Sequence, residues 1–152
     1  MSVFFYFILA IILAIADQLV KYWVVANLEL GQQTALLPNI LSLYHIRNTG
    51  AAWSIFEGKM WFFTIISVVA IAVLSYLLVK YYRNGRIFSL GVALILGGTL
   101  GNFIDRIRLG YVVDMFKTDF IQFPIFNLAD VELTIGVIFI FIYILFEERF
   151  KK

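Results

Sequence analysis

Four long apolar stretches, at residues 3–26, 61–79, 87–104 and 131–146, constrain the fold of this 152-residue chain more than any other feature. A helix needs about 20 apolar residues to cross the hydrocarbon core of a bilayer, and each stretch is near that length, although the fourth is short. Hydrophobic residues make up 62% of the chain and charged residues 14%, so it is more apolar than a soluble domain. The sequence therefore predicts an all-α integral membrane protein with four transmembrane helices, forming one polytopic domain over residues 1–152.

The absence of cysteine excludes several kinds of chemistry. The chain forms no disulfide, thiol nucleophile or cysteine-ligated zinc site, and it has no cysteine of its own for lipid attachment. Ala14-Ile15-Ala16 resembles a signal-peptidase cleavage site, but no lysine or arginine precedes the apolar run and hydrophobicity resumes after Asp17. We therefore expect the first stretch to be a retained membrane helix.

Basic residues predict which ends of the spans face the cytoplasm. With four spans, both termini and the loop at 80–86 share one side of the membrane, and the loops at 27–60 and 105–130 share the other. Each side has six lysine and arginine residues, but those of the first side are packed into two short segments. The positive-inside rule then favours cytoplasmic termini and extracytoplasmic loops. The residues that carry this inference are Lys80, Arg83, Arg86, Arg149, Lys151 and Lys152.

The two extracytoplasmic loops contain patterns typical of short strands and turns. Residues 41–47 mix apolar and polar side chains in a way that suits a strand better than an amphipathic helix, and Asn48-Thr49-Gly50 is typical of a turn. Residues 111–116 predict a second extended segment, and Pro124 interrupts the chain before the last helix. We therefore expect a small extracytoplasmic β-structure at one end of the helices.

Two aspartates of the second loop are the strongest candidates for chemistry. Asp114 lies within the apolar run 112–116, and Asp130 directly precedes the last apolar stretch. An acid at the edge of the hydrocarbon region is costly to keep and suggests a function, so two acids on one membrane face suggest paired carboxylate chemistry. Each has a structural alternative. Asp130 suits the N-cap of a helix, and Asp114 is alternatively a solvated loop acid.

The first apolar stretch contains an acid and a base. Asp17 and Lys21 are one turn apart on the same helix face, which predicts an ion pair. One interpretation is that the two charges simply neutralise each other inside the bundle. The alternative is that the pair also braces a nearby site.

The end of the third stretch combines glycines with polar residues. Gly97 and Gly101 form a small-xxx-small face that lets another helix approach closely. Asn102, Asp105 and Arg106 follow on one face. We expect Arg106 to neutralise Asp105, which makes Asp105 a scaffolding residue and not a chemical one.

Other kinds of catalytic site lack the residues that they require. The sequence has one histidine, so it forms neither an HExxH zinc site nor a two-histidine metal site, and we expect His45 to be a strand or interface residue. No GxSxG motif supplies a serine nucleophile, and nothing around Ser54 and Lys59 supports a serine–lysine dyad. Paired carboxylates, which need no metal and no cofactor, are the chemistry that remains.

Five short blocks bring these residues together in a fixed order. They are Asp17-Gln18-Leu19-Val20-Lys21, Asn48-Thr49-Gly50-Ala51-Ala52-Trp53-Ser54, Gly101-Asn102-Phe103-Ile104-Asp105-Arg106, Val112-Val113-Asp114 and Phe126-Asn127-Leu128-Ala129-Asp130. In order and context they resemble the lipoprotein signal peptidase family (signal peptidase II) over essentially the whole chain. One departure is Val131, where the family commonly has a serine, so a hydroxyl group next to the site is in doubt.

The resemblance implies an intramembrane aspartic endopeptidase. Such an enzyme removes the signal peptide of a diacylglyceryl-modified prolipoprotein just before the lipobox cysteine, so the implied partners are that substrate and membrane lipid, and not nucleic acid. It implies a catalytic dyad of Asp114 and Asp130 without metal or cofactor, and a sheet-like cradle in the first outer loop. The site would face outward from the bacterial cytoplasmic membrane, and because one chain supplies it, we expect a monomer. The residues that match the polar or close-packed shell of the dyad are Asp17, Lys21, Asn48, Gly50, Asn102, Asp105, Arg106, Asn127 and Ala129.

Two other classes of function stay open from the residues themselves. Membrane acids paired with bases also mark the pathways of ion- or proton-coupled transporters, but here the charges gather at the outer face, with no polar chain across the midplane. A non-catalytic membrane adaptor would use the acids only as caps and ion-pair partners. In an adaptor, replacement of Asp114 by asparagine would be silent.

Overall fold

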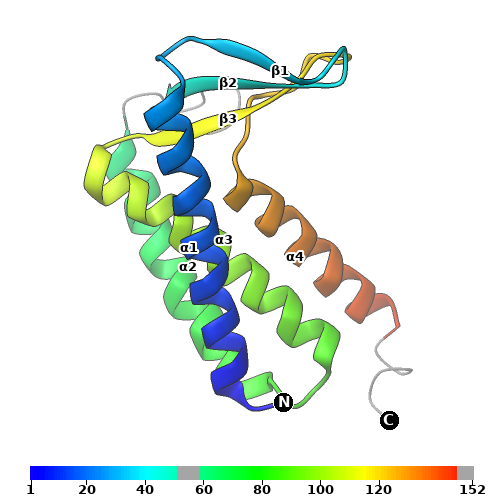
Figure 1. Ribbon diagram of the computed structural model, residues 1–152. Helices are drawn as coiled ribbons and strands as arrows, with labels where there is room; N and C mark the ends of the chain where they lie inside the picture. Colours follow the sequence, from blue (N-terminus) through cyan, green and yellow to red (C-terminus); the bar gives the residue numbers. More distant parts are fainter. Residues whose placement is uncertain (51–58, 147–152) are drawn as a thin grey trace.

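The computed structural model describes residues 1–50 and 59–146, which form four helices with a small sheet across one end (Figure 1). All four helices are long and apolar enough to cross a membrane, which confirms the predicted fold class. Ser54 and the basic residues of the C-terminal segment lie outside the described residues. The elements are α1 (Val3–Asn27), β1 (Gln33–Leu37), β2 (Leu41–Asn48), α2 (Met60–Tyr81), α3 (Arg86–Leu109), β3 (Val112–Thr118) and α4 (Leu128–Leu145).

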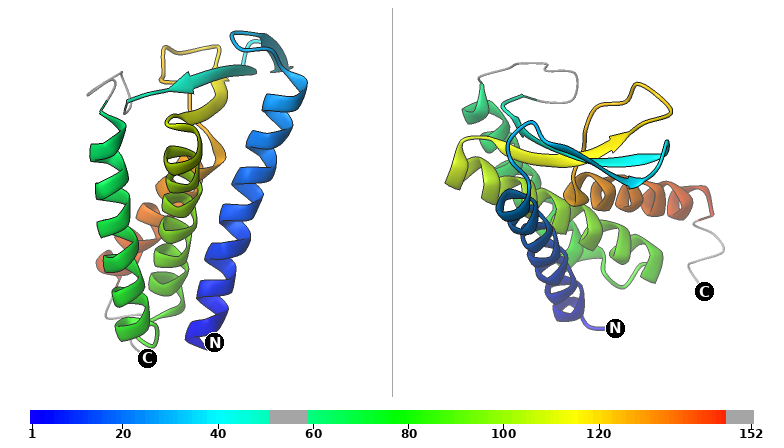
Figure 2. Two further views of the ribbon diagram at one scale, coloured as in Figure 1. Left: turned by 90° about the vertical axis from the view of Figure 1, so that its left-hand side faces the viewer. Right: turned by 45° about the horizontal axis from the view of Figure 1, so that its top comes forward.

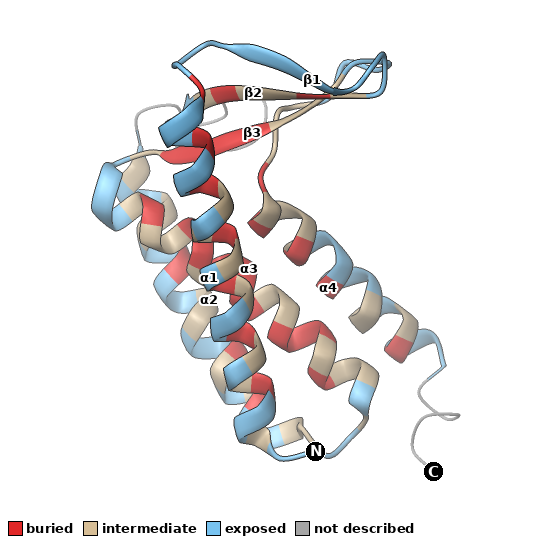
Figure 3. Cartoon of the chain, in the orientation of Figure 1, coloured by how far each residue is buried: buried red, intermediate tan, exposed pale blue. Residues whose placement is uncertain are grey.

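The outer surface of the helices is apolar, as a lipid environment requires. Large side chains such as Phe4 and Ile11 of α1, Val69 of α2 and Phe141 of α4 are exposed. Figure 3 shows exposed residues along the outward faces of these helices and buried residues where the helices meet. In water such a surface would be strongly unfavourable, whereas in a bilayer it contacts lipid tails.

Helix α3 is the centre of the bundle. It packs against α1, α2 and α4, and 56% of its span is buried, against 22% or less for the other three. A Cβ atom on Gly97 would lie 2.8 Å from an α1 side chain, and one on Gly101 would lie 2.5 Å from Asp17 Oδ2. These two glycines therefore form the close helix contact predicted for them. Gly91 makes a similar contact with α4, because its Cβ would lie 2.9 Å from the Gly136 carbonyl oxygen.

The sheet is antiparallel with the strand order β1-β2-β3. Strands β2 and β3 confirm the two extended segments predicted at 41–47 and 111–116, whereas β1 was not predicted because its five exposed residues show no alternation. Gly110, in the left-handed conformation at φ 75°, ends α3 and lets the chain turn into β3. The sheet lies at the end of the bundle opposite the N-terminus and the α2–α3 connection (Figures 1 and 2).

Candidate active site

Asp114 and Asp130 reach the same place from different elements. Asp114 lies in β3 and is 1% exposed, and Asp130 lies in the first turn of α4. Asn127 contacts both carboxylates. Its Nδ2 donates to Asp114 Oδ1 at 2.6 Å, and its backbone N–H donates to Asp130 Oδ2 at 3.1 Å. The structure therefore brings the two aspartates singled out from the sequence to one site.

Asp130 has a structural role in its helix, but not the predicted one. The N-cap of α4 is Asn127, whose side-chain oxygen accepts from the Asp130 N–H at 3.0 Å. Asp130 is the third residue of the helix and completes a capping box by accepting from the Asn127 N–H. The assignment of Asp130 as N-cap was wrong, since α4 begins three residues earlier than the apolar pattern predicts. The Asp130 Oδ1 atom remains available and accepts from Asn102 Nδ2 at 3.0 Å.

Asp114 is not a solvated loop acid, because it lies in β3 and its side chain is buried. Asn48 Nδ2 donates to its Oδ2 at 2.8 Å, while Asn48 Oδ1 accepts from the Gly50 N–H at 2.9 Å and closes the predicted turn. Burial, followed by the charge of Asp130, raises the pKa of Asp114 to about 7, against the opposing effect of the hydrogen bonds from Asn48 and Asn127. A pair of carboxylates in this setting shares a proton easily.

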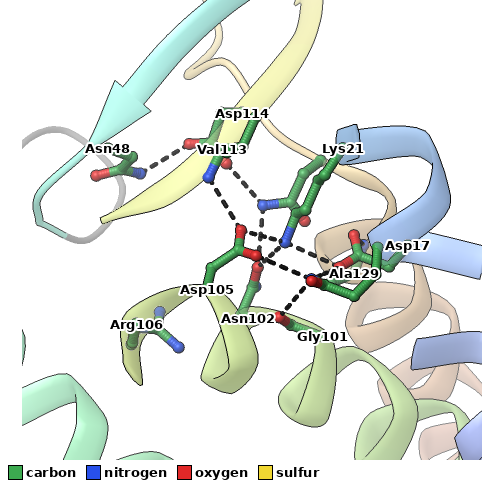
Figure 4. Close-up of polar contacts among 12 residues, drawn as sticks. Asp17, Lys21, Asn48, Gly101, Asn102, Asp105, Arg106, Val113, Asp114 and Ala129 are labelled. Atoms are coloured by element: carbon green, nitrogen blue, oxygen red, sulfur yellow. Dashed lines mark hydrogen bonds and ion pairs between the residues drawn. The ribbon is translucent and has the colours of Figure 1, made fainter. Parts of the chain in front are cut away.

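Lys21 is the centre of a charged cluster that it forms with Asp17 and Asp105 (Figure 4). Its ammonium group lies 2.9 Å from Asp17 Oδ2, 2.9 Å from Asp105 Oδ2 and 3.0 Å from Asn102 Oδ1. A lysine ammonium has three donors, and these contacts use all of them. The predicted pair of Asp17 and Lys21 is confirmed, and it also braces the site.

Arg106 does not neutralise Asp105, contrary to the expectation from their adjacency. Among the described residues, the ion-pair partner of Asp105 is Lys21, and Arg106 Nη1 instead donates to Ser67 Oγ of α2 at 3.2 Å. Figure 4 shows the Arg106 side chain apart from the Lys21 cluster. Neighbours in a helix point about 100° apart, so adjacency in sequence does not bring two side chains together.

Lys21 also sets the orientation of the amides that hold the dyad. An ammonium only donates, so the oxygen of Asn102 must face Lys21 and its nitrogen must face Asp130. The same oxygen of Asn102 accepts from Asn127 Nδ2 at 3.1 Å. A continuous chain of hydrogen bonds therefore runs from the Lys21 cluster to both carboxylates.

The acids of the cluster also hold the backbone that carries the dyad. Asp17 Oδ1 accepts from the Ala129 N–H at 3.0 Å, which attaches the start of α4 to α1. Asp105 Oδ2 accepts from the Val113 N–H at 3.1 Å, which attaches β3 to α3. Gln18 was not assigned a role from the sequence, yet its Nε2 donates to Asp105 Oδ1 at 2.8 Å.

A cavity of about 730 Å³ opens beside the dyad between α2 and α4. Most of its wall is apolar, and its polar lining includes both aspartates, the amides that bind them and Arg106. Within residues 1–50 and 59–146, no three histidine, aspartate or glutamate side chains are grouped to hold a metal ion. The described lining residues are Asn48, Gly50, Phe63, Ile66, Ser67, Ala70, Thr99, Asn102, Arg106, Val112, Asp114, Phe123, Pro124, Ile125, Phe126, Asn127, Asp130, Val131, Leu133, Thr134 and Ile135.

Comparison with known proteins identifies the family. Residues 9–146 match the family model for signal peptidase (SPase) II. The chain belongs to the signal peptidase II family. It is 52% identical over 147 residues to the lipoprotein signal peptidase of Enterococcus faecalis, covering 97% of this chain and 91% of that protein. It is 53% identical over 147 residues to the lipoprotein signal peptidase of Lactiplantibacillus plantarum, covering 97% and 98%.

Two solved structures of bacterial membrane enzymes have a similar fold. A bacterial membrane enzyme solved by the in meso method at 2.3 Å resolution superposes with a TM-score of 0.87 at 39% identity, covering 92% of this chain and 87% of that one. A second such structure, at 1.9 Å resolution, gives a TM-score of 0.85 at 39% identity and covers 92% of each chain. The chain is thus a multi-pass membrane peptidase of the aspartic type, as the resemblance implied.

Sequence reasoning assigned no role to two polar residues inside the spans. Ser67 interrupts the second apolar stretch and contacts Arg106. Glu132 is the acid within the fourth stretch and is buried, and neither of its carboxyl oxygens has a hydrogen-bond partner among the described residues. A polar residue inside a hydrophobic run is itself a signal, and both could have been found by it. The histidine prediction is confirmed, since His45 is buried in β2 with Nδ1 2.9 Å from the Leu28 carbonyl oxygen.

Replacement of Glu132 by methionine is expected to stabilise the protein. The change removes a buried carboxyl that has no hydrogen-bond partner among the described residues and keeps a side chain of similar length, so we expect a gain of about 1–3 kcal/mol. Thermal unfolding in detergent measures the effect. Glu132→Gln keeps a buried polar group of the same shape and, as the matched control, should change the midpoint little. A lower midpoint for Glu132→Met would instead mean that Glu132 has a favourable partner.

Proposed function

We propose that this protein removes the signal peptide from diacylglyceryl-modified prolipoproteins, cutting just before the lipobox cysteine, with Asp114 and Asp130 as its catalytic dyad. The observation that carries the proposal is the bridging of both carboxylates by Asn127 at the wall of a mostly apolar cavity. The relatives' name, lipoprotein signal peptidase, supports the substrate class.

The cavity suits a lipidated substrate held within the membrane. It lies between α2 and α4, and its apolar lining would contact the signal helix and the acyl chains next to the cleavage point. The polar groups are gathered at the dyad, where the scissile peptide bond must lie. An apolar wall with a few convergent polar groups excludes water except at the site of reaction.

The two carboxylates take different roles in hydrolysis. Asp114, whose pKa burial raises to about 7, holds the shared proton, and Asp130 accepts a proton from the attacking water. The resulting hydroxide attacks the scissile carbonyl carbon while the Asp114 proton polarises the carbonyl oxygen. When the C–N bond breaks, the proton taken up by Asp130 passes to the leaving amine.

The surrounding amides keep the dyad in position for these steps. Asn48 and Asn127 each bind one oxygen of Asp114, and Asn102 binds Asp130. Because Lys21 orients Asn102, the ion-pair cluster preorganises the carboxylates without itself touching the reacting atoms. A single chain supplies every group, which supports a monomeric enzyme with its one domain spanning residues 1–152.

We further propose that the sheet and the dyad face the outside of the cytoplasmic membrane. Lys80, Arg83 and Arg86 lie at the opposite end of the bundle, around the α2–α3 connection near the N-terminus. Under the positive-inside rule, these basic residues support a cytoplasmic location for that end of the bundle.

Cleavage by the purified protein in lipid nanodiscs tests the proposed function. A diacylglyceryl-modified prolipoprotein and the same protein without the lipid are incubated with the enzyme and resolved by gel shift, with mass spectrometry to locate the cut. We expect the modified substrate alone to be cut, directly before its cysteine. If the folded enzyme cuts neither substrate, the transporter alternative takes the place of this proposal.

The rate of cleavage is expected to fall as the pH rises through about 7. The mechanism needs the proton on Asp114, and that proton is lost near this pH. In the unfolded chain Asp114 releases this proton near pH 3.8. The stability that the protonated Asp114 contributes to the folded state is therefore also lost as the pH rises to about 7. Measurement of kcat/KM from mildly acidic to alkaline pH, with unfolding midpoints as the control, separates the two effects. A rate that rises through neutral pH would assign the base to Asp114.

A further inference from the structure

An exposed apolar patch lies at one end of the sheet, away from the dyad. It combines the tip of the β1–β2 hairpin with the loop that follows β3, and we refer to residues 36–40 and 120–123 together as the lip (Figure 1). Six large side chains of the lip are between 51% and 64% exposed. They are Leu36, Leu37, Ile40, Phe120, Ile121 and Phe123.

Hydrogen bonds join the two parts of the lip into one surface. The Asp119 N–H donates to the Ile40 carbonyl oxygen at 3.0 Å, and Ser42 Oγ donates to Asp119 Oδ2 at 2.6 Å. The hairpin tip is itself closed by an N–H donation from Ile40 to the Leu37 carbonyl oxygen at 3.0 Å. These hydrogen bonds hold the two segments side by side, so the apolar side chains of the lip form one surface.

The composition of the lip indicates what covers it. The lip contains no charged side chain, and it includes Pro38 and the six exposed aliphatic or aromatic residues named above. In water, exposed apolar area of this extent is unfavourable, and on soluble proteins it marks a binding surface. A lipid surface takes up such a patch without a complementary shape, and it accepts aromatic side chains at its boundary.

The lip is continuous with the wall of the cavity and with the start of α4, which is one of the four candidate spans. Phe123 belongs both to the lip and to the wall of the cavity, and the chain runs directly from it through residues 124–127 into α4. In Figure 1 the lip lies at the end of the sheet on the side of α4. The sheet lies where α1 ends and α4 begins, so the surface of a membrane crossed by these helices would lie near the level of the sheet.

We propose that the lip inserts into the boundary between headgroups and acyl chains of the leaflet from which the sheet emerges. The sheet is then attached to the membrane at two places, by the spans on one side and by the lip on the other. One consequence is that the mouth of the cavity next to Phe123 stays at the depth of the lipid boundary, where a diacylglyceryl group would lie. The insertion itself does not depend on the peptidase activity.

Single cysteines report the position of the lip, because the chain has no cysteine of its own. Ile40→Cys and Phe120→Cys place a nitroxide label on each part of the lip. Glu29→Cys, at an exposed position in the α1–β1 turn, is the matched control. The labelled proteins are placed in nanodiscs of phosphatidylcholine and phosphatidylglycerol, and thermal unfolding checks that each is folded. Power saturation then compares collisions with oxygen, which concentrates in lipid, and with a water-soluble nickel chelate.

We expect the ratio of oxygen to nickel collisions at residues 40 and 120 to exceed that at residue 29 several-fold. Equal ratios at the three positions would overturn the proposal, because the lip would then lie in water. Protection of residues 40 and 120 from both reagents would also overturn it, since a second copy or another protein would then cover the lip. Activity is not needed for either result, so failure of the proposed function is distinguished from failure of this inference.

Discussion

Asp114→Asn and Asp130→Asn are each expected to lower the rate of prolipoprotein cleavage by about 10²- to 10⁴-fold while the protein stays folded. Asparagine has the shape of aspartate but neither accepts nor supplies the proton that hydrolysis needs. Asn48 and Asn127 donate to Asp114, and an asparagine oxygen at position 114 can accept one of these hydrogen bonds. The effect should therefore lie mainly in kcat.

The test uses purified variants in nanodiscs with the lipidated substrate, and a thermal melt for each. Glu29→Gln, which removes an exposed acid of the first loop, is the matched control and should cleave like the wild type. Near wild-type cleavage by either folded dyad variant would move the chemistry to other residues. An unchanged Asp114→Asn variant would also fit the non-catalytic adaptor.

Lys21→Met is expected to destabilise the protein by about 3–5 kcal/mol. The substitution removes the ammonium that neutralises Asp17 and Asp105, both of which are buried, and leaves their carboxylates without a counter-ion. It also frees the oxygen of Asn102, so the amide that binds Asp130 loses its fixed orientation. We expect a lower unfolding midpoint, with loss of cleavage in the fraction that folds.

Thermal unfolding in detergent measures this effect, and Lys80→Met is the control because Lys80 is an exposed lysine at the other end of the bundle. Addition of Asp105→Asn to Lys21→Met should restore part of the stability, since it removes one of the two uncompensated charges. If Lys21→Met melts like the wild type, the cluster does not hold the helices together. In that case its contacts with the acids are incidental.

Several features of this protein follow from local properties that a sequence displays directly. The length of an apolar run decides whether a helix can span a bilayer, so the four spans were predicted to within five residues at their ends. The cost of an acid next to hydrocarbon is also local, and it singled out Asp114 and Asp130 as chemical candidates. The spacing of Gly97 and Gly101 likewise predicted a close helix contact, which α1 makes.

The partners of the polar side chains were decided by the tertiary structure. Lys21 contacts Asn102, which is 81 positions later in the chain. Lys21 is also the ion-pair partner of Asp105, whereas adjacency in the sequence predicted Arg106 for that role. Asn127 contacts both aspartates because it is the N-cap of α4, which starts at Leu128. The apolar pattern predicts a later start for this helix. A side chain's partner depends on where packed helices cross and which face each residue presents. Periodicity predicts the faces within one element, whereas only the packing of different elements determines which faces meet.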